Sequence, residues 1–148
     1  MQSLSPNILA LLPEYILTIV GVLIMLAEPL LPAASSRKLL GWLAILGAVA
    51  AAFASWYQLH LGTLTAFSGT VQVDTFSVFF HLLISAIVLV TLLISLAFFQ
   101  GSTRHAGEYF ALVAFSAVGM MLMTSATELL VVFVGLEISS IATYILCG

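Results

Sequence analysis

An acidic side chain, Glu137, stands near the middle of a predominantly apolar run, residues 128–147. A run of this length can cross a lipid bilayer as a single helix. A charge at membrane depth costs about 2.5–3.5 kcal/mol on insertion scales, so a carboxyl group there normally has a partner, a path to water or a retained proton. We therefore predict that Glu137 is the catalytic residue of a proton-translocation site inside the membrane.

Hydroxyl side chains accompany Glu137 on the same predicted helix. Because residues three, four and seven positions apart share a helix face, Ser140 and Tyr144 point with Glu137, and Thr143 flanks them. Their hydroxyls are able to hydrogen-bond a carboxyl group or a chain of water molecules. We expect this polar stripe to face protein rather than lipid, and the small residue Gly135 to let a neighbouring helix approach closely. The competing interpretation is a neutral acid that only holds two helices together.

A histidine and two further acids lie in other apolar stretches. His81 stands about two turns into the third stretch, and histidine titrates in the range that a proton relay would use. The competing interpretation of His81 is a packed donor to a neighbouring hydroxyl. Glu14 and Glu28 stand near the two ends of the first stretch and are expected to be interface charges, with a place along a proton path as the alternative.

The composition identifies the class of protein. Hydrophobic residues make up 63% and charged residues 6% of the 148 residues, against about 25% charged residues in soluble domains. The mean hydropathy is +1.27. This indicates an integral membrane protein and excludes a soluble catalytic domain. The formal net charge of -3 gives no sign of a nucleic-acid partner. The single cysteine, Cys147, cannot form an internal disulfide, and no spacing of cysteine and histidine predicts a metal site.

The chain is predicted to be a single all-α domain, residues 1–148, with five transmembrane helices. The predicted helices run over residues 9–31, 39–61, 75–100, 108–124 and 128–147. Residues 62–74 are predicted to form an extracytoplasmic loop. The alternation of Val71, Gln72 and Val73 favours a short extended segment or hairpin in it.

Short polar sequences predict where several helices begin. Pro13 is early enough for the first turn of its helix, where a missing N–H does no harm. Asp74 immediately precedes the third helix and is placed to accept a hydrogen bond from the free amides of the first turn. Thr127 or Ser125 is expected to cap the fifth helix, with Glu128 in its first turn.

The three basic residues predict the orientation of the bundle. Arg37 and Lys38 lie between the first and second helices, and Arg104 lies between the third and fourth. Because short loops with lysine and arginine stay in the cytoplasm, the N-terminus is placed outside. The first stretch has no basic residue before it, which argues against a signal peptide. The chain ends directly after the fifth helix, which favours a truncated part of a larger antiporter-like helix bundle.

Several motifs resemble one family of membrane proteins. They are LPE at 12–14, DTFS at 74–77, GEYFAL at 107–112, GMMLM at 119–123 and ELLVVFVGLE at 128–137, followed by Tyr144. Together they resemble the N-terminal part of subunit N of the proton-pumping NADH:quinone oxidoreductase, respiratory complex I, in the antiporter-like membrane subunit family. The resemblance spans the whole chain and is most specific over residues 107–144.

The resemblance implies a function and a set of partners. In this family a glutamate on the fifth helix works with lysines on later helices, and Glu137 matches that glutamate. Proton translocation would be coupled to electron transfer from NADH to quinone, with enzyme activity only as part of the complex. FMN, iron-sulfur clusters and quinone would be bound by partner subunits, and no cofactor by this chain. The expected partners are other membrane-arm subunits and the lipid bilayer, in the cell inner (plasma) membrane.

The sequence departs from the family in its lysines. The only one, Lys38, is expected in a loop, and the lysine-bearing helices would follow Gly148. We therefore expect this chain to pump no protons by itself. Two other interpretations stay open. One is a pump subunit of a multisubunit cation/proton antiporter or membrane-bound hydrogenase, and the other is a non-pumping structural membrane subunit or remnant.

Overall fold

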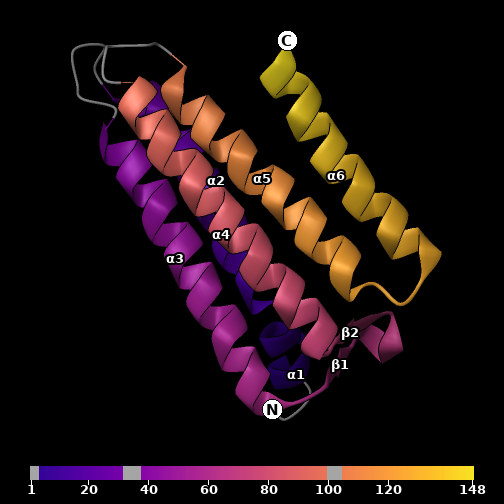
Figure 1. Cartoon of the computed structure of the whole chain (residues 1–148). Coiled ribbons are helices and arrows are strands. Elements are labelled where there is room, and N and C mark those ends of the chain that lie inside the picture. The colour runs from indigo at the N-terminus through magenta and orange to yellow at the C-terminus, as the bar shows by residue number, and fades with distance from the viewer. Residues whose placement is uncertain (1–3, 32–37, 100–104) are drawn as a thin grey trace.

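The computed structural model describes residues 4–31, 38–99 and 105–148. Helices dominate this part of the chain, with one short β-hairpin, which confirms the all-α class (Figure 1). In chain order the elements are α1 (Leu4–Ala10), α2 (Leu12–Ala27), the 3-10 turn η1 (Glu28–Leu30), α3 (Lys38–Leu61), β1 (Leu64–Ala66), the 3-10 turn η2 (Phe67–Gly69), β2 (Val71–Val73), α4 (Thr75–Phe98), α5 (Ala106–Ser125) and α6 (Leu129–Cys147).

Five stretches of the described chain are helical, long and apolar enough to cross a bilayer. They are Leu12–Leu30, Lys38–Leu61, Thr75–Phe98, Ala106–Ser125 and Leu129–Cys147. The protein is therefore a polytopic membrane protein, as the apolar stretches predict.

The helix boundaries differ from the predicted ones at several ends. The first spanning helix begins at Leu12, not at residue 9, and α5 begins at Ala106, two residues early. Lys38, predicted in a loop, is the first residue of α3. Helix α4 ends at Phe98, and residue 100, its predicted end, lies outside the described residues.

A separate short helix, α1, precedes the first span and was not predicted. Pro13 lies in the first turn of α2, as predicted, and it has no N–H to donate to the carbonyl of Leu9 one turn earlier. The buried side chain of Gln58, on α3, fills this gap. Its Nε2 donates to the carbonyl oxygens of Leu9 at 2.7 Å and Ala10 at 3.0 Å. The break between α1 and α2 is therefore held by a hydrogen-bonding residue far along the chain.

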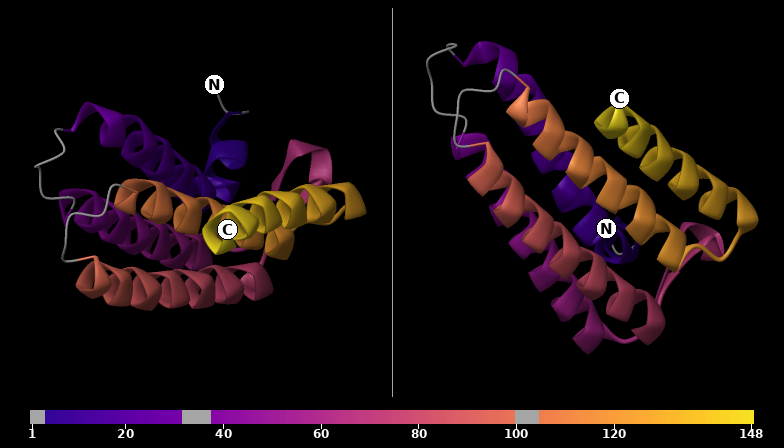
Figure 2. Two further views of the ribbon diagram at one scale, coloured as in Figure 1. Left: turned by 90° about the horizontal axis from the view of Figure 1, so that it is seen from above. Right: turned by 45° about the horizontal axis from the view of Figure 1, so that its top comes forward.

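Helices α2, α3, α4 and α5 form the core of the bundle, and α6 packs on α5 at its edge (Figures 1 and 2). The largest fully buried side chains include Leu17, Ile24, Leu92, Phe110 and Met121. In the spanning windows of α5 and α6, 56% and 11% of the residues are buried, respectively. Most of the surface of α6 is thus uncovered by the described chain.

A β-hairpin closes one end of the bundle, as the alternating valines predict. Strands β1 and β2 pair antiparallel, with Val71 and Val73 buried and Gln72 exposed between them. The backbone N–H of Phe67 donates to Asn7 Oδ1 at 3.1 Å, which joins the hairpin to α1. Val71 also forms an isolated antiparallel bridge with Ala126, which joins it to the α5–α6 connection.

One predicted helix cap is present and another is wrong. Asp74 caps α4, since its Oδ1 accepts a hydrogen bond from the backbone N–H of Ser77 at 2.9 Å. At α6 the N-cap is Glu128, with no side-chain cap hydrogen bond. The predicted capping residues act elsewhere, because the Thr127 hydroxyl donates to Gly69 O in the hairpin and the Ser125 hydroxyl donates back into α5.

Candidate functional site

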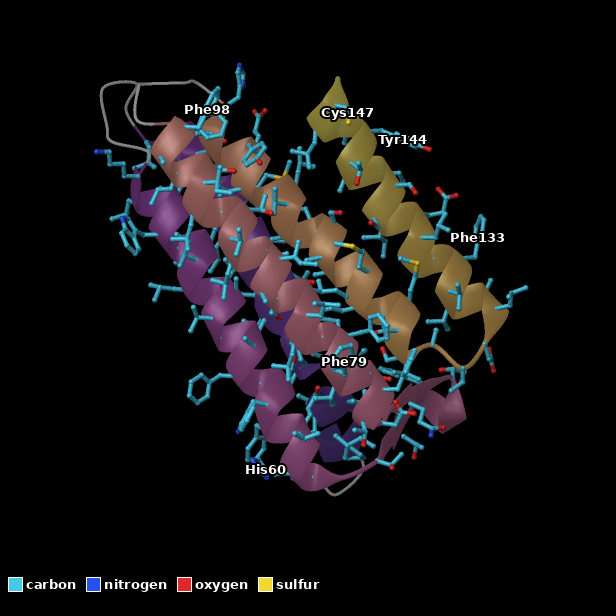
Figure 3. All side chains as sticks on the ribbon, in the orientation of Figure 1. His60, Phe79, Phe98, Phe133, Tyr144 and Cys147 are labelled. Carbon is cyan, nitrogen blue, oxygen red and sulfur yellow. The ribbon has the colours of Figure 1, made fainter. Side chains whose placement is uncertain are left out.

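Glu137 lies in the middle of α6, on the exposed side of that helix. Among the described residues, no hydrogen bond or ion pair reaches its carboxylate. Phe133 and Tyr144, on the same helix, are 58% and 73% exposed and project away from α5 (Figure 3). The predicted protein environment of Glu137 is therefore not supplied by this part of the chain, and its proton-translocation role stays a prediction.

The structure separates the predicted hydroxyl stripe into two groups. Ser140 is half-buried and Tyr144 is exposed, and both remain near the face of Glu137. Thr143 instead belongs to the α5–α6 contact. Its Oγ1 donates to Ser139 O at 2.8 Å and lies 3.4 Å from Ser116 Oγ, which in turn lies 3.2 Å from Ser139 Oγ. The roles of all three predicted residues stay predictions.

Small residues determine how closely α6 approaches α5. A Cβ at Gly119 would lie 2.5 Å from the carbonyl oxygen of Gly135, and one at Gly135 would lie 2.8 Å from that of Gly119. Ala142, further along α6, is also buried. Glycine and alanine let the two backbones approach, and the Ser116, Ser139 and Thr143 hydroxyls pair beside them. This contact holds α6 with its Glu137 face outward.

Glu14 is not an interface charge, and this prediction was wrong. Its side chain lies inside the bundle with 4% exposure, and His81, on α4, is 0% exposed. Glu14 Oε1 lies 3.5 Å from His81 Nε2. The same Nε2 lies 3.2 Å from the backbone carbonyl oxygen of Met121, on α5. The partners of His81 are therefore a carboxyl group and a carbonyl group, and not the hydroxyl that was the competing expectation.

A signal for this burial exists in the sequence. Glu14 shares the spacing of the buried positions Leu17, Gly21 and Ile24, which places it on the inward face of α2. Its nearness to the start of the helix argued for the interface. That argument failed because α1 and the hairpin cover this end of the bundle. The length of the first apolar stretch predicts a spanning helix, but it predicts neither the separate helix α1 nor how α1 packs.

Glu28 is also buried, at 7% exposure, so the prediction of an interface charge is wrong here too. Its Oε1 accepts a hydrogen bond at 3.3 Å from the backbone N–H of Gly107, in the first turn of α5. A helix leaves its first amides unpaired and carries a partial positive charge at this end, so a carboxylate there is stabilised. A Cβ at Gly107 would lie 2.6 Å from Glu28 Oε2, so glycine is required for this approach.

Of the three basic residues, the structure describes one. Lys38 begins α3, whereas Arg37 and Arg104 lie outside the described residues. An exposed pair, His105 Nδ1 and Glu108 Oε2 at 3.3 Å, marks the start of α5 at the same end. The outside location of the N-terminus stays a prediction.

Within residues 4–31, 38–99 and 105–148, no group of three or more histidine, cysteine, aspartate or glutamate residues is placed to hold a metal ion.

The chain is similar to several proteins named as subunit N of an oxidoreductase or a dehydrogenase. No protein-family model matches the chain. It is 44% identical over 146 residues to NADH-quinone oxidoreductase subunit N 2 of Koribacter versatilis, covering 93% of this chain and 29% of that protein. It is 34% identical to NADH-quinone oxidoreductase subunit N of Trichlorobacter lovleyi, covering 96% of this chain and 29% of that protein. It is 35% identical to F(420)H(2) dehydrogenase subunit N of Methanosarcina mazei, covering 96% of this chain and 30% of that protein.

These similarities confirm the resemblance predicted from the motifs. They extend over nearly the whole chain, which spans about 30% of the length of the curated relatives it matches. They do not favour the antiporter or hydrogenase interpretation, nor that of a non-pumping remnant.

Proposed function

We propose, from the resemblance of this chain to subunit N of NADH-quinone oxidoreductases, that it is part of a membrane-arm subunit of such a complex and contributes to proton translocation. The observation that carries the proposal is the 44% identity over 93% of the chain. Proton transfer is coupled to electron transfer from NADH to quinone, and the enzyme activity belongs to the whole complex. The location is the cell inner (plasma) membrane, with other membrane-arm subunits as partners.

Electron carriers are assigned to the partner subunits. A chain with 35% identity is a subunit of an F(420)H(2) dehydrogenase, whereas others are subunits of NADH-quinone oxidoreductases. The similarity persists although the named electron donors differ, which supports donor binding elsewhere in each complex. FMN, iron-sulfur clusters and quinone are accordingly assigned to other subunits, and no cofactor to this chain.

Glu137 is the proposed proton-translocating group. A carboxylate at membrane depth needs a compensating charge or a proton, so its proton occupancy responds to a cation brought near it. The uncovered face of α6 leaves Glu137 accessible to such a group, and the family resemblance suggests a lysine from a later helix. Ser140 and Tyr144, which lie near the same face, are assigned the role of passing a proton along it. Thr143 acts less directly, because its hydroxyl is engaged in the α5–α6 contact.

The test is Glu137→Gln in the full-length subunit, within the assembled complex in closed vesicles. Glutamine keeps the shape of the side chain and removes its exchangeable acidic proton. We expect normal assembly with fewer protons transferred per electron. Glu128→Gln is the matched control, since it removes an acid at the start of the same helix and should leave the ratio unchanged. An unchanged ratio in the Glu137→Gln complex would refute the assignment, and loss of assembly would favour a structural role.

A further inference from the structure

A second acidic group inside the bundle has no part in the Glu137 site. Glu14 on α2 and His81 on α4 face each other, with Oε1 and Nε2 separated by 3.5 Å. Their exposures are 4% and 0%. Glu137, by contrast, lies on the uncovered side of α6, which packs on α5. The two acids therefore occupy different environments in the same bundle.

The polar atoms of this pair are incompletely satisfied. Within the described residues, both carboxyl oxygens of Glu14 and Nδ1 of His81 are buried without a hydrogen bond. The carbonyl oxygen of Met121, 3.2 Å from Nε2, already accepts hydrogen bonds from the hydroxyls of Thr124 and Ser125. Buried polar atoms without partners are costly, so a fold that serves stability alone would not be expected to retain them.

Charge counting limits the protonation states of the pair. No other ion pair to Glu14 or His81 occurs among the described residues. With one acidic proton the pair has no net charge, either as carboxylic acid and neutral imidazole or as carboxylate and imidazolium. A second proton would leave a net positive charge and the loss of the first a net negative charge. Both are unfavourable in a buried, apolar environment.

We propose that Glu14 and His81 share one exchangeable proton and form a second intramembrane proton site, distinct from Glu137. In the transfer step neutral His81 carries its ring proton on Nδ1, so Nε2 has a free electron pair; the O–H bond at Glu14 Oε1 breaks, an N–H bond forms at His81 Nε2, and the electrons of the broken O–H bond stay on the carboxylate. Imidazolium then directs this N–H toward Oε1 and the carbonyl oxygen of Met121. This inference rests on the proposed function, because it assigns a second group to the same proton translocation.

Buried polar residues lie on both sides of His81 along α4. Ser77, His81 and Ser85 follow each other at four-residue spacing on the buried face of α4. The Ser77 hydroxyl lies 3.0 Å from Asp74 Oδ1, at the hairpin end of the helix. Ser85 Oγ is buried without a hydrogen bond within the described chain, one turn deeper than His81. A row of hydroxyl and imidazole groups thus leads inward from the hairpin, with the pair in its middle.

The test uses the assembled complex with the full-length subunit in closed vesicles. We expect Glu14→Gln and His81→Gln each to lower the number of protons transferred per electron, and the double variant to lower it by no more than either single one, because one site is emptied in each case. Glu28→Gln is the matched control, since it changes another buried acid, and its ratio should stay unchanged. Unchanged ratios in the Glu14→Gln and His81→Gln complexes would overturn the proposal, as would losses that multiply in the double variant.

A variant with exchanged residues separates proton sharing from packing. Glu14→His combined with His81→Glu retains one acid, one imidazole and the same net charge, so it should restore part of the lost ratio. In infrared spectra, a carbonyl band of a buried carboxylic acid that shifts in D2O should be absent in Glu14→Gln and displaced in His81→Gln. Failure of both single variants and of the exchanged variant to assemble would show a structural pair. If Glu137→Gln lowers the ratio while Glu14→Gln does not, this inference fails and the proposed function stands.

Discussion

Gly119 and Gly135 face each other across the α5–α6 contact, where a Cβ added at Gly119 would lie 2.5 Å from the carbonyl oxygen of Gly135. No side chain is small enough to enter this space unless the backbones move apart. The position of α6, and with it that of Glu137, therefore depends on two residues that carry no chemistry of their own.

The first prediction concerns this contact. Gly119→Ala should lower the stability of the subunit by about 1–3 kcal/mol, as overpacking does elsewhere. Thermal unfolding of the full-length subunit in detergent measures this change. Gln72→Ala, at an exposed strand position, is the control. Equal unfolding temperatures for both variants would contradict the close contact.

The second prediction concerns the hydrogen bonds of Gln58 to Leu9 and Ala10. Gln58→Ala leaves two backbone carbonyls at the α1–α2 break without their donor, at a cost of about 1–3 kcal/mol for a buried group left unpaired. We expect faster amide hydrogen exchange in α1 while the rest of the bundle changes little. Gln72→Ala, at an exposed strand position, should leave exchange in α1 unchanged. Unaltered α1 exchange in Gln58→Ala would mean that the break is held by other contacts.

The third prediction concerns the carboxylate at the start of α5. Glu28→Ala removes the acceptor of the Gly107 N–H and leaves it buried, so unfolding should occur at lower temperature, with a cost of about 1–3 kcal/mol. Glu28→Gln keeps an acceptor oxygen and should cost less. Glu108→Ala, an exposed acid in the same turn, serves as the control. If Glu28→Ala were as stable as Glu108→Ala, the hydrogen bond would contribute nothing to stability.

The fourth prediction concerns the pH dependence of the α4 cap. The backbone N–H of Ser77, donating to Asp74 Oδ1, holds the pKa of Asp74 below its usual value. Because the folded protein favours the carboxylate, the stabilisation is complete above the ordinary aspartate pKa of about 4 and is lost as the pH falls through the lower folded value. Asp74→Ala should cost about 1 kcal/mol at neutral pH, as the loss of a cap does.

Thermal unfolding of wild type and Asp74→Ala at neutral pH and near pH 3 tests the sign. The difference in unfolding temperature between wild type and Asp74→Ala should be smaller near pH 3 than at neutral pH. Asp74→Asn keeps a capping oxygen that does not titrate. The difference in unfolding temperature between Asp74→Asn and Asp74→Ala should therefore be nearly the same at both pH values. A gap between wild type and Asp74→Ala that widened in acid would contradict the direction of the pKa change.

The spans, the hairpin and one helix cap could be predicted from the sequence, because each depends on residues close together in the chain. A long apolar run, the alternation at Val71 and Val73, and an aspartate before an apolar helix are local patterns. The burial of Glu14 and Glu28 is different. Local spacing puts Glu14 on the inward face of α2, but no local pattern predicts that Glu14 meets His81 or that Glu28 meets Gly107, because these partners lie far along the chain.

The candidate site also has a part that local patterns predict and a part that they do not. The hydroxyl pattern around Glu137 follows from helix geometry, but the Thr143 hydroxyl lies beside Ser116 on another helix. The start of α6 was misplaced for a related reason. The Thr127 hydroxyl, a plausible cap in the sequence, donates to the carbonyl of Gly69 in the hairpin. Competition between local and distant partners can be resolved only once the distant partner is located.

The hairpin has a mechanical consequence for the two proposed proton sites. Strand β2 is bridged to the α5–α6 connection at Ala126 and continues directly into Asp74, which caps the helix carrying His81. A tilt of α6 would therefore pull on β2 and, through it, on the first turn of α4. The hairpin thus connects α6, which carries Glu137, to α4, which carries His81. A movement at the Glu137 site can reach the His81 site through this backbone connection, without passing through the apolar core.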